Sequence, residues 1–183
     1  MSTFPIHTIE SSPELSRPSL EALQRSFGMI PNIARAMATS PVLIGSLVGL
    51  FGKVHGGSFS ERQVQVLLLT NAVTNACDWA VAFHSFLAVQ EGVAETDVEA
   101  IRARRLPQDA KDAALSNVAR TLIEKRGRLS EQDASAFLGA GFGKDHLLEV
   151  IAVVAASTIT NYTGNVTEPP LEEALLAYRW RAA

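Results

Sequence analysis

The sequence predicts an all-α protein that forms a single helical bundle domain. Three observations predict it. Helix-capping signals recur along the chain, apolar residues in several segments keep a helical spacing, and convincing strand signals do not appear. A chain of 183 residues that is 47% hydrophobic is long enough to bury the core of one domain. We expect residues 1–12 to form an extended N-terminal lead-in and residues 13–183 to form the helical domain.

The first two expected helices lie on either side of a glycine pair. Ser40-Pro41 is a cap-then-proline start for a helix that runs to about Val54, and Gly56-Gly57 ends it. Ser60-Glu-Arg-Gln63 is a capping box that starts the next helix. The apolar run Val64–Leu69 can be interpreted as a buried strand, but its place within a longer capped segment favours a helix.

Three further helices are expected in the middle of the chain. Thr96-Asp-Val-Glu99 is a second capping box, which starts a short helix that Pro107 ends. From Asp109 to Arg126 the apolar residues keep a spacing of about 3.6, and Gly127 supplies a stop signal. Ser130 caps a short helix that reaches Leu138.

The C-terminal part predicts one long core helix and one terminal helix. Asp145–Ile159 is apolar on nearly all sides, which indicates a helix in the middle of a bundle or at an interface. Its segment Val150–Val154 is the second candidate for a buried strand, and helix is again favoured by length. We expect Asn161–Asn165 to end the helix with Gly164 as its cap. Pro169-Pro170 then starts an amphipathic helix that reaches Trp180.

Charge and cysteine content exclude several classes of function. Sixteen basic and nineteen acidic residues give a net charge of −3 with no dense basic run, which argues against nucleic acid or an anionic membrane as a partner. A lone cysteine rules out a disulfide framework and is typical of a reducing compartment. No apolar stretch has the length of a membrane span, and the N-terminus lacks a secretory pattern. We therefore expect a soluble, cytoplasmic protein. His7 and His146 have no partners at metal-ligand spacing, so no metal and no cofactor is expected.

The segment Asn75-Ala-Cys-Asp-Trp-Ala-Val-Ala-Phe-His84 carries the most chemical information. Cys77 is followed seven positions later by His84, and Ala80 stands where a Cys-x-x-Cys pair needs its second thiol. An intramolecular dithiol cycle is thereby excluded. On one helix, positions 77 and 84 lie within about 20° of the same face but about 10.5 Å apart along the axis. This separation is too large for a direct hydrogen bond.

Several motifs of the chain resemble those of one protein family. Phe27-Gly-Met-Ile-Pro-Asn32 with Thr39-Ser-Pro41, the stretch from Ser60 to Cys77, His84 and the helix Leu147–Asn161 are similar to the alkylhydroperoxidase D-like proteins of the carboxymuconolactone decarboxylase superfamily, in particular their peroxidase-related branch. The resemblance covers residues 16–172. It implies an all-helical domain that is usually oligomeric, so a homo-oligomer is expected.

The family's peroxidatic residues transfer to four positions of this chain, two of which differ. Peroxidatic members use a glutamate twelve residues before the first cysteine, two cysteines and a histidine. The resemblance places these at Gln65, Cys77, Ala80 and His84. Gln65 keeps the shape of glutamate but cannot accept a proton at neutral pH. Ala80 lacks the thiol usually held to attack, and Trp79 stands where some members have a histidine.

These substitutions leave three functional hypotheses. The first is a small-molecule enzyme with His84 as acid and base, because decarboxylase-type relatives carry out proton transfer on small carboxylates or lactones without a cysteine pair. Its expected catalytic residues are His84, Cys77 and Gln65, with Trp79 and Ala80 binding substrate. The second is a non-catalytic oligomeric binding or scaffold protein. The third is a one-cysteine peroxidase that uses Cys77 with an external thiol.

Each candidate residue also has a structural interpretation. Free cysteine is often a small buried hydrophobe, so Cys77 can be purely structural. A lone histidine among apolar residues is usually a satisfied core residue, which applies to His84, and Trp79 can simply fill the old reaction pocket. His55, beside the glycine pair, is a further candidate for a base on a mobile loop. Asn161 is a candidate to face the pocket.

Overall fold

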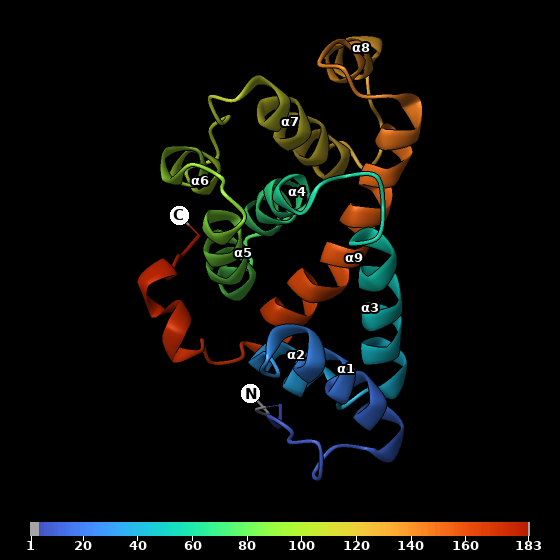
Figure 1. Ribbon diagram of the computed structural model, residues 1–183, viewed down its shortest axis with the longest axis vertical. Helices are drawn as coiled ribbons and strands as arrows, with labels where there is room; N and C mark the ends of the chain where they lie inside the picture. Colours follow the sequence, from blue (N-terminus) through green and yellow to red (C-terminus); the bar gives the residue numbers. More distant parts are fainter. Residues whose placement is uncertain (1–3, 183) are drawn as a thin grey trace.

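The computed structural model describes residues 4–182, in which every regular element is helical (Figure 1). The α-helices are α1 Arg17–Phe27, α2 Asn32–Met37, α3 Pro41–Val54, α4 Glu61–Thr74, α5 Asp78–Gln90, α6 Glu95–Arg102, α7 Ala110–Glu124, α8 Glu131–Gly139 and α9 Lys144–Thr167. Two short 3-10 helices are η1 Glu14–Ser16 and η2 Glu173–Tyr178. The predicted all-α fold is confirmed for these residues.

Helix α4 is the centre of the bundle. It packs against α5, α7 and α9, and Figure 1 shows it between them, with α3 alongside α9. The side chains from Val64 to Thr70 are almost fully buried, so over this stretch the helix has no solvent face. A second apolar cluster joins α1, α2 and α3, with Leu20, Met37 and Ile44 fully or nearly fully buried.

Local capping chemistry set four of the helix starts. The Ser40 hydroxyl accepts a hydrogen bond from the Leu43 N–H, with Pro41 in the first turn of α3. Ser60 and Gln63 form the predicted capping box of α4. Asp109 caps α7, and Ser130 caps α8 in a box with Asp133. A capping side chain satisfies backbone N–H groups that have no partner within the helix, which is why these starts follow the sequence closely.

Three predicted boundaries were wrong. Helix α6 begins at Glu95 with Ala94 as its cap, so the Thr96 box lies inside the helix. Helix α9 continues to Thr167, and Glu168, at φ 44°, ends it in place of Gly164. The residues after Pro169-Pro170 form only the 3-10 turn η2 and not an amphipathic α-helix.

The long helix α9 is half core and half surface. Val150, Val153 and Ala156 are fully buried, whereas Leu148 and Val166 are each 68% exposed. Among the described residues α9 is the one helix long and apolar enough to cross a membrane, but 44% of its most apolar window is buried inside the bundle. The core helix of a globular protein has the same properties.

Both ends of the described chain are attached to the bundle. Residues 4–12 contain no helix, and the Arg35 Nε donates to the His7 carbonyl at 2.7 Å. At the other end, the segment from Pro169 to Ala182, called the C-terminal strap below, returns past α5 towards α6 (Figure 1). Arg102 donates to the carbonyl oxygens of Tyr178 and Arg179, and the Trp180 indole N–H donates to the Arg102 carbonyl. The strap therefore closes one side of the region around α5.

Candidate functional site

Cys77 is the cap of α5 and not a member of the helix. Its extended backbone follows Ala76, whose φ is 50°, and its N–H donates to the Ala72 carbonyl at 3.0 Å. The side chain is fully buried. Burial raises the pKa of the thiol to about 11, and the nearby backbone N–H groups of Ala80 and Trp79 oppose this only in part. The thiolate, which is the nucleophilic form, is thus scarce at neutral pH.

Close packing against α9 also encloses the sulfur. A Cβ built on Gly164 would lie 2.5 Å from the Cys77 Sγ and 3.2 Å from the Ile33 Cδ1. Only a residue without a side chain allows α9 to pass so near. This explains why Gly164 stands inside the helix, where it was expected to end it, and it shows that the thiol fills a closed space.

His84 and Gln65 form a buried polar pair. The His84 Nδ1 lies 3.0 Å from the Gln65 Oε1, and the two residues are 3% and 4% exposed. An amide oxygen only accepts, so Nδ1 carries the proton and Nε2 keeps its lone pair. Burial, followed by Coulomb repulsion from the protonated form of His55, lowers the pKa of His84 to about 3. The imidazole is therefore neutral at physiological pH. No hydrogen bond joins it to Cys77 within the described chain.

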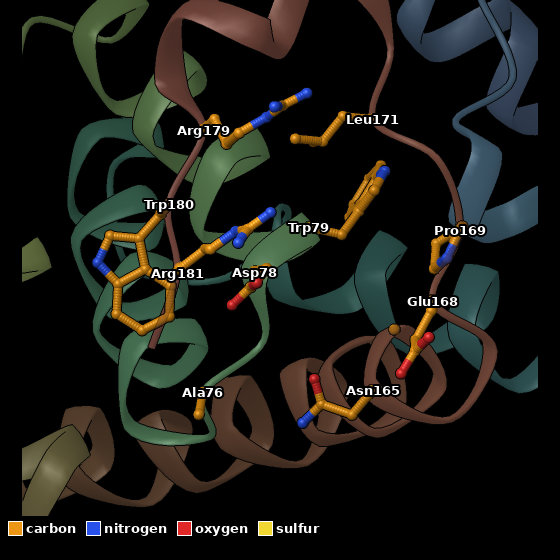
Figure 2. A pocket seen from close by; sticks show the side chains of 11 residues that line it. Ala76, Asp78, Trp79, Asn165, Glu168, Pro169, Leu171, Arg179, Trp180 and Arg181 are labelled. Carbon is orange, nitrogen blue, oxygen red and sulfur yellow. The ribbon is translucent and has the colours of Figure 1, made fainter. Parts of the chain in front are cut away.

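Trp79 links α5 to the C-terminal strap. Its indole N–H donates to the Glu172 Oε2 at 3.0 Å, and the Glu172 Oε1 accepts from the Asn32 N–H at 2.6 Å. The indole ring stacks on Phe83 with 4.9 Å between centroids. Figure 2 shows Trp79 at the wall of a pocket of about 500 Å³ between Arg181 and α9. Ala80, the second residue expected to bind substrate, is fully buried and is part of none of the pocket walls described here.

Two hollows meet at the His84–Gln65 pair. The smaller, of about 60 Å³, is nearly all apolar and includes His84, Trp79 and Thr160 in its wall. The Thr160 Oγ1 is buried without a hydrogen-bond partner in the described chain. The larger, of about 780 Å³, lies between α1, α3, α4, α5 and the strap, and Gln65 is part of its wall. Both hollows share Leu23, Phe27, Phe51 and Phe83. We call the larger one the main pocket.

The main pocket contains a polar pair that the sequence did not predict as a unit. The His55 Nδ1 lies 2.7 Å from the Glu61 Oε2, and both residues belong to the pocket wall. The sequence indicates His55 alone as a candidate base and Glu61 only as part of a capping box. Their spacing of six residues across a loop is no linear motif. Among the described residues, no group of three or more potential ligands could hold a metal ion.

Two further buried amides lie outside the His84–Gln65 pair. Neither amide atom of Asn71, on the same helix as Gln65, has a hydrogen-bond partner in the described chain. Asn161 is likewise fully buried with both amide atoms unpaired, and it is part of none of the pocket walls described here. Neither residue therefore joins the candidate site.

Comparison with known proteins identifies the fold. No protein-family model and no curated protein matches the sequence. Solved structures do match along nearly the whole chain. The alkylhydroperoxidase AhpD core of an uncharacterized peroxidase-related protein from Ralstonia eutropha JMP134 has a TM-score of 0.83 at 15% identity, with 95% of this chain and 94% of that chain covered. A peroxidase-related protein from Silicibacter sp. TM1040 has a TM-score of 0.79 at 18% identity, with 96% and 94% covered.

An enzyme with a known ligand has the same fold. The debrominase Bmp8 has a TM-score of 0.80 at 15% identity, with 97% of this chain and 96% of that chain covered. A cysteine-to-alanine variant of Bmp8, in complex with 2,3,4-tribromopyrrole, matches with a TM-score of 0.77. The chain thus has the alkylhydroperoxidase D-like fold that its motifs resemble.

Proposed function

We propose that the chain is a small-molecule enzyme of the alkylhydroperoxidase D-like type that works by proton transfer and without a thiol. One observation supports this most. The Gln65–His84 hydrogen bond holds a neutral imidazole beside a hollow, while the only thiol of the chain is enclosed. The polar pair thus keeps access to a ligand that the thiol lacks.

His84 has a defined part in this proposal. Gln65 fixes the proton on Nδ1, so Nε2 accepts a hydrogen bond from the substrate and orients it. A base with a pKa of about 3 is a poor acceptor of a substrate's proton at pH 7, because a general base works best when its pKa is near the operating pH. His84 then acts as an acid and base only after the substrate has entered and changed its surroundings. Otherwise it orients the substrate.

The walls of the two hollows favour a small, flat, apolar ring. They share three phenylalanines and a leucine, and Trp79 adds a further ring to the smaller hollow. Aromatic side chains pack well against flat ligands. The debrominase with the same fold was solved with a tribrominated pyrrole. This supports a ligand of similar size and shape here.

A non-catalytic binding or scaffold protein is the second candidate. It is favoured by Trp79, because its bulk fills space beside α5 and its hydrogen bond to Glu172 holds the strap over that helix. The one-cysteine peroxidase has less support, because the thiol of Cys77 is buried and its pKa is raised. A scaffold binds partners or ligands without turnover.

We also propose that the protein is a homo-oligomer. Large apolar side chains lie exposed along α9, such as Tyr162 at 59%, and Val42 at the start of α3 is 80% exposed. Exposed apolar patches of this kind mark interaction surfaces. Light scattering of the purified protein at two concentrations tests the proposal, and a monomer at both would contradict it.

Fluorescence tests binding in the site directly. In a Trp180→Phe background Trp79 is the only tryptophan, and it is part of the wall of the smaller hollow. We expect a neutral halogenated pyrrole to quench the fluorescence of Trp79. Gln65→Leu should weaken the affinity for the pyrrole about 10-fold, which is the cost of one hydrogen bond. Cys77→Ala, the matched control, retains the affinity. Peroxide consumption with a dithiol stays at the buffer rate. If the wild type consumes peroxide and Cys77→Ser abolishes this activity, the one-cysteine peroxidase is favoured. If no small ring quenches Trp79, the scaffold protein is the hypothesis that remains.

A further inference from the structure

We propose that His55, oriented by Glu61, is the catalytic base of the main pocket, and that the pocket accepts neutral carbonyl compounds whose α-carbon carries an acidic proton. This inference rests on the proposed function, because it names the base that a buried neutral His84 does not supply. It adds a second polar site to the one formed by Gln65 and His84.

The His55–Glu61 pair has the geometry of an oriented base. The Nδ1 of His55 lies 2.7 Å from a carboxylate oxygen of Glu61. A carboxylate only accepts, so Nδ1 carries the proton and Nε2 presents a lone pair. The Nε2 makes no hydrogen bond within the described chain. Phe51 lies one turn earlier on α3, with its ring centroid 5.7 Å from the imidazole, and further fixes the ring.

The loop that carries His55 is attached to α9. His55 ends α3, and its N–H donates to the Phe51 carbonyl at 2.9 Å. The Ser58 N–H donates to the Glu149 Oε1 at 2.8 Å, and Gly57 packs directly against that carboxylate. The loop was expected to be mobile, but these contacts hold it. A base in a fixed place can act on a substrate without first ordering itself.

Gln65 supplies a donor in the same pocket. Glu61 and Gln65 are four residues apart on α4, so they lie on the same face of that helix. The Gln65 Oε1 is engaged by His84, whereas its Nε2 makes no hydrogen bond within the described chain. Gln65 is more than nine-tenths buried and is part of the pocket wall. Its amide N–H is therefore suited to the oxygen of a carbonyl group.

The charge of the pocket restricts the substrate. The titratable residues of the wall are His55 and three glutamates, Glu61, Glu91 and Glu172, and none of the described residues there is Lys or Arg. With His55 neutral, as its role of base requires, a carboxylate or phosphate would meet like charge with no cation to pair with. The small carboxylates suggested by the family resemblance fit this wall poorly. A neutral lactone or cyclic ketone meets no such charge conflict.

The reaction needs no oxidant or further reactant. Nε2 of His55 takes the proton from the carbon next to the carbonyl group, so a C–H bond breaks and an N–H bond forms. The electron pair of the C–H bond moves into the carbonyl group, whose oxygen becomes an enolate held by the Gln65 N–H. Glu61 pairs with the imidazolium. The imidazolium N–H exchanges its proton for one from the solvent. Transfer of this solvent proton to the same carbon completes the hydrogen exchange, and proton transfer to the far end of a conjugated enolate isomerises the double bond.

Deuterium exchange tests this step. The probe is the β,γ-unsaturated ketone isomer of cyclohexenone in deuterated buffer, with α-deuterium followed by NMR and the conjugated product by absorbance. We expect the wild type to accelerate both, and His55→Gln to lower the rate about 100-fold, the usual contribution of a general base. His146→Gln is the matched control, because His146 also pairs with a carboxylate but lines none of the pockets described here. It retains the wild-type rate.

The positioning role of Glu61 has its own readout. We expect Glu61→Gln to move the pH–rate profile to lower pH, because the imidazolium loses its anionic partner, and Glu61→Asp to restore part of the rate. A purely structural role would leave the profile unmoved. A ring ketone that bears a carboxylate should react more slowly than the neutral probe.

Failure of this inference and failure of the proposed function are distinguishable. If neutral rings still quench Trp79 but His55→Gln exchanges deuterium as fast as the wild type, His55 is not the base and the proposed function stands. If the folded wild type neither binds rings nor exchanges deuterium, both fail. Circular dichroism and the urea midpoint of each variant establish that it is folded.

Discussion

Replacing Gly164 with alanine tests whether Cys77 is a packing element. Gly164 lies inside α9, where alanine is favoured over glycine by about 1 kcal/mol on helix propensity alone. The added Cβ would lie 2.5 Å from the Cys77 Sγ. The sulfur has no room to retreat, because the side chain is fully buried. Overpacking of this kind costs about 1–3 kcal/mol.

The expected change in the free energy of unfolding therefore has the opposite sign to that of an ordinary Gly→Ala replacement in a helix. We expect Gly164→Ala to lower the free energy of unfolding by up to about 2 kcal/mol, which is the overpacking cost less the gain in propensity. Gly49 is the matched control, since it lies inside α3, is exposed, and has nothing within 4 Å of an added Cβ. Gly49→Ala should raise the free energy of unfolding by roughly 0.5–1 kcal/mol.

A double-mutant cycle assigns the cost to the sulfur. With Cys77→Ala in the background the crowding is relieved, so Gly164→Ala should recover about 2 kcal/mol relative to its effect in the wild type. The assay is urea unfolding followed by far-ultraviolet circular dichroism, with the slope m compared between variants. If Gly164→Ala stabilises the protein as Gly49→Ala does, or if the two changes are additive, the close approach of α9 to the thiol is wrong.

Three further predictions concern His84, the Arg62–Asp112 ion pair and Ala80. The free energy of unfolding should fall progressively as the pH drops below 6.5, because His84 becomes protonated in the unfolded chain but not in the folded chain, where its pKa is about 3. The loss should reach a few kcal/mol by pH 4. Urea unfolding between pH 7 and pH 4 measures it, and the loss should be smaller in His84→Gln. Arg62→Met should cost about 3 kcal/mol, because it leaves the fully buried carboxylate of Asp112 without its ion pair at 2.6 Å; an unchanged urea midpoint would contradict this. Ala80→Cys should form a disulfide with Cys77 on oxidation, since the Ala80 N–H already contacts the sulfur, and two free thiols after oxidation in a folded variant would refute that placement.

The helices that the sequence predicted well are those with local signals. Ser40, Ser60, Asp109 and Ser130 each satisfy backbone groups within three residues, so no distant contact is needed to place them. The run Val64–Leu69, for which a helix was favoured over a buried strand, is part of α4. A local rule was sufficient in each case.

The errors arise where a distant contact decides. Gly164 reads as a helix stop, but it is required because α9 passes close to Cys77, nearly ninety residues earlier in the chain. The strap after Pro170 is short and turned because Arg102 holds its carbonyl oxygens. No sequence window contains these partners.

The candidate site was predicted in part. The sequence named Gln65 and His84 through the family resemblance, and the structure joins them in one hydrogen bond. Their catalytic role stays a prediction, as do those of Cys77, Trp79 and Ala80 and the cytoplasmic location. His55, at the end of α3, and Glu61, at the start of α4, meet across the loop that contains the glycine pair. The sequence alone could not show that meeting.

The most direct test of non-thiol chemistry is deuterium exchange measured for wild type and Cys77→Ala side by side. The same neutral unsaturated ketone is incubated with each protein in deuterated buffer, and the rate is normalised to folded protein. The proposed chemistry predicts exchange by both proteins, with rates that agree within about threefold, a difference below 1 kcal/mol. Loss of exchange in a folded Cys77→Ala variant, or no exchange by the wild type, would contradict it.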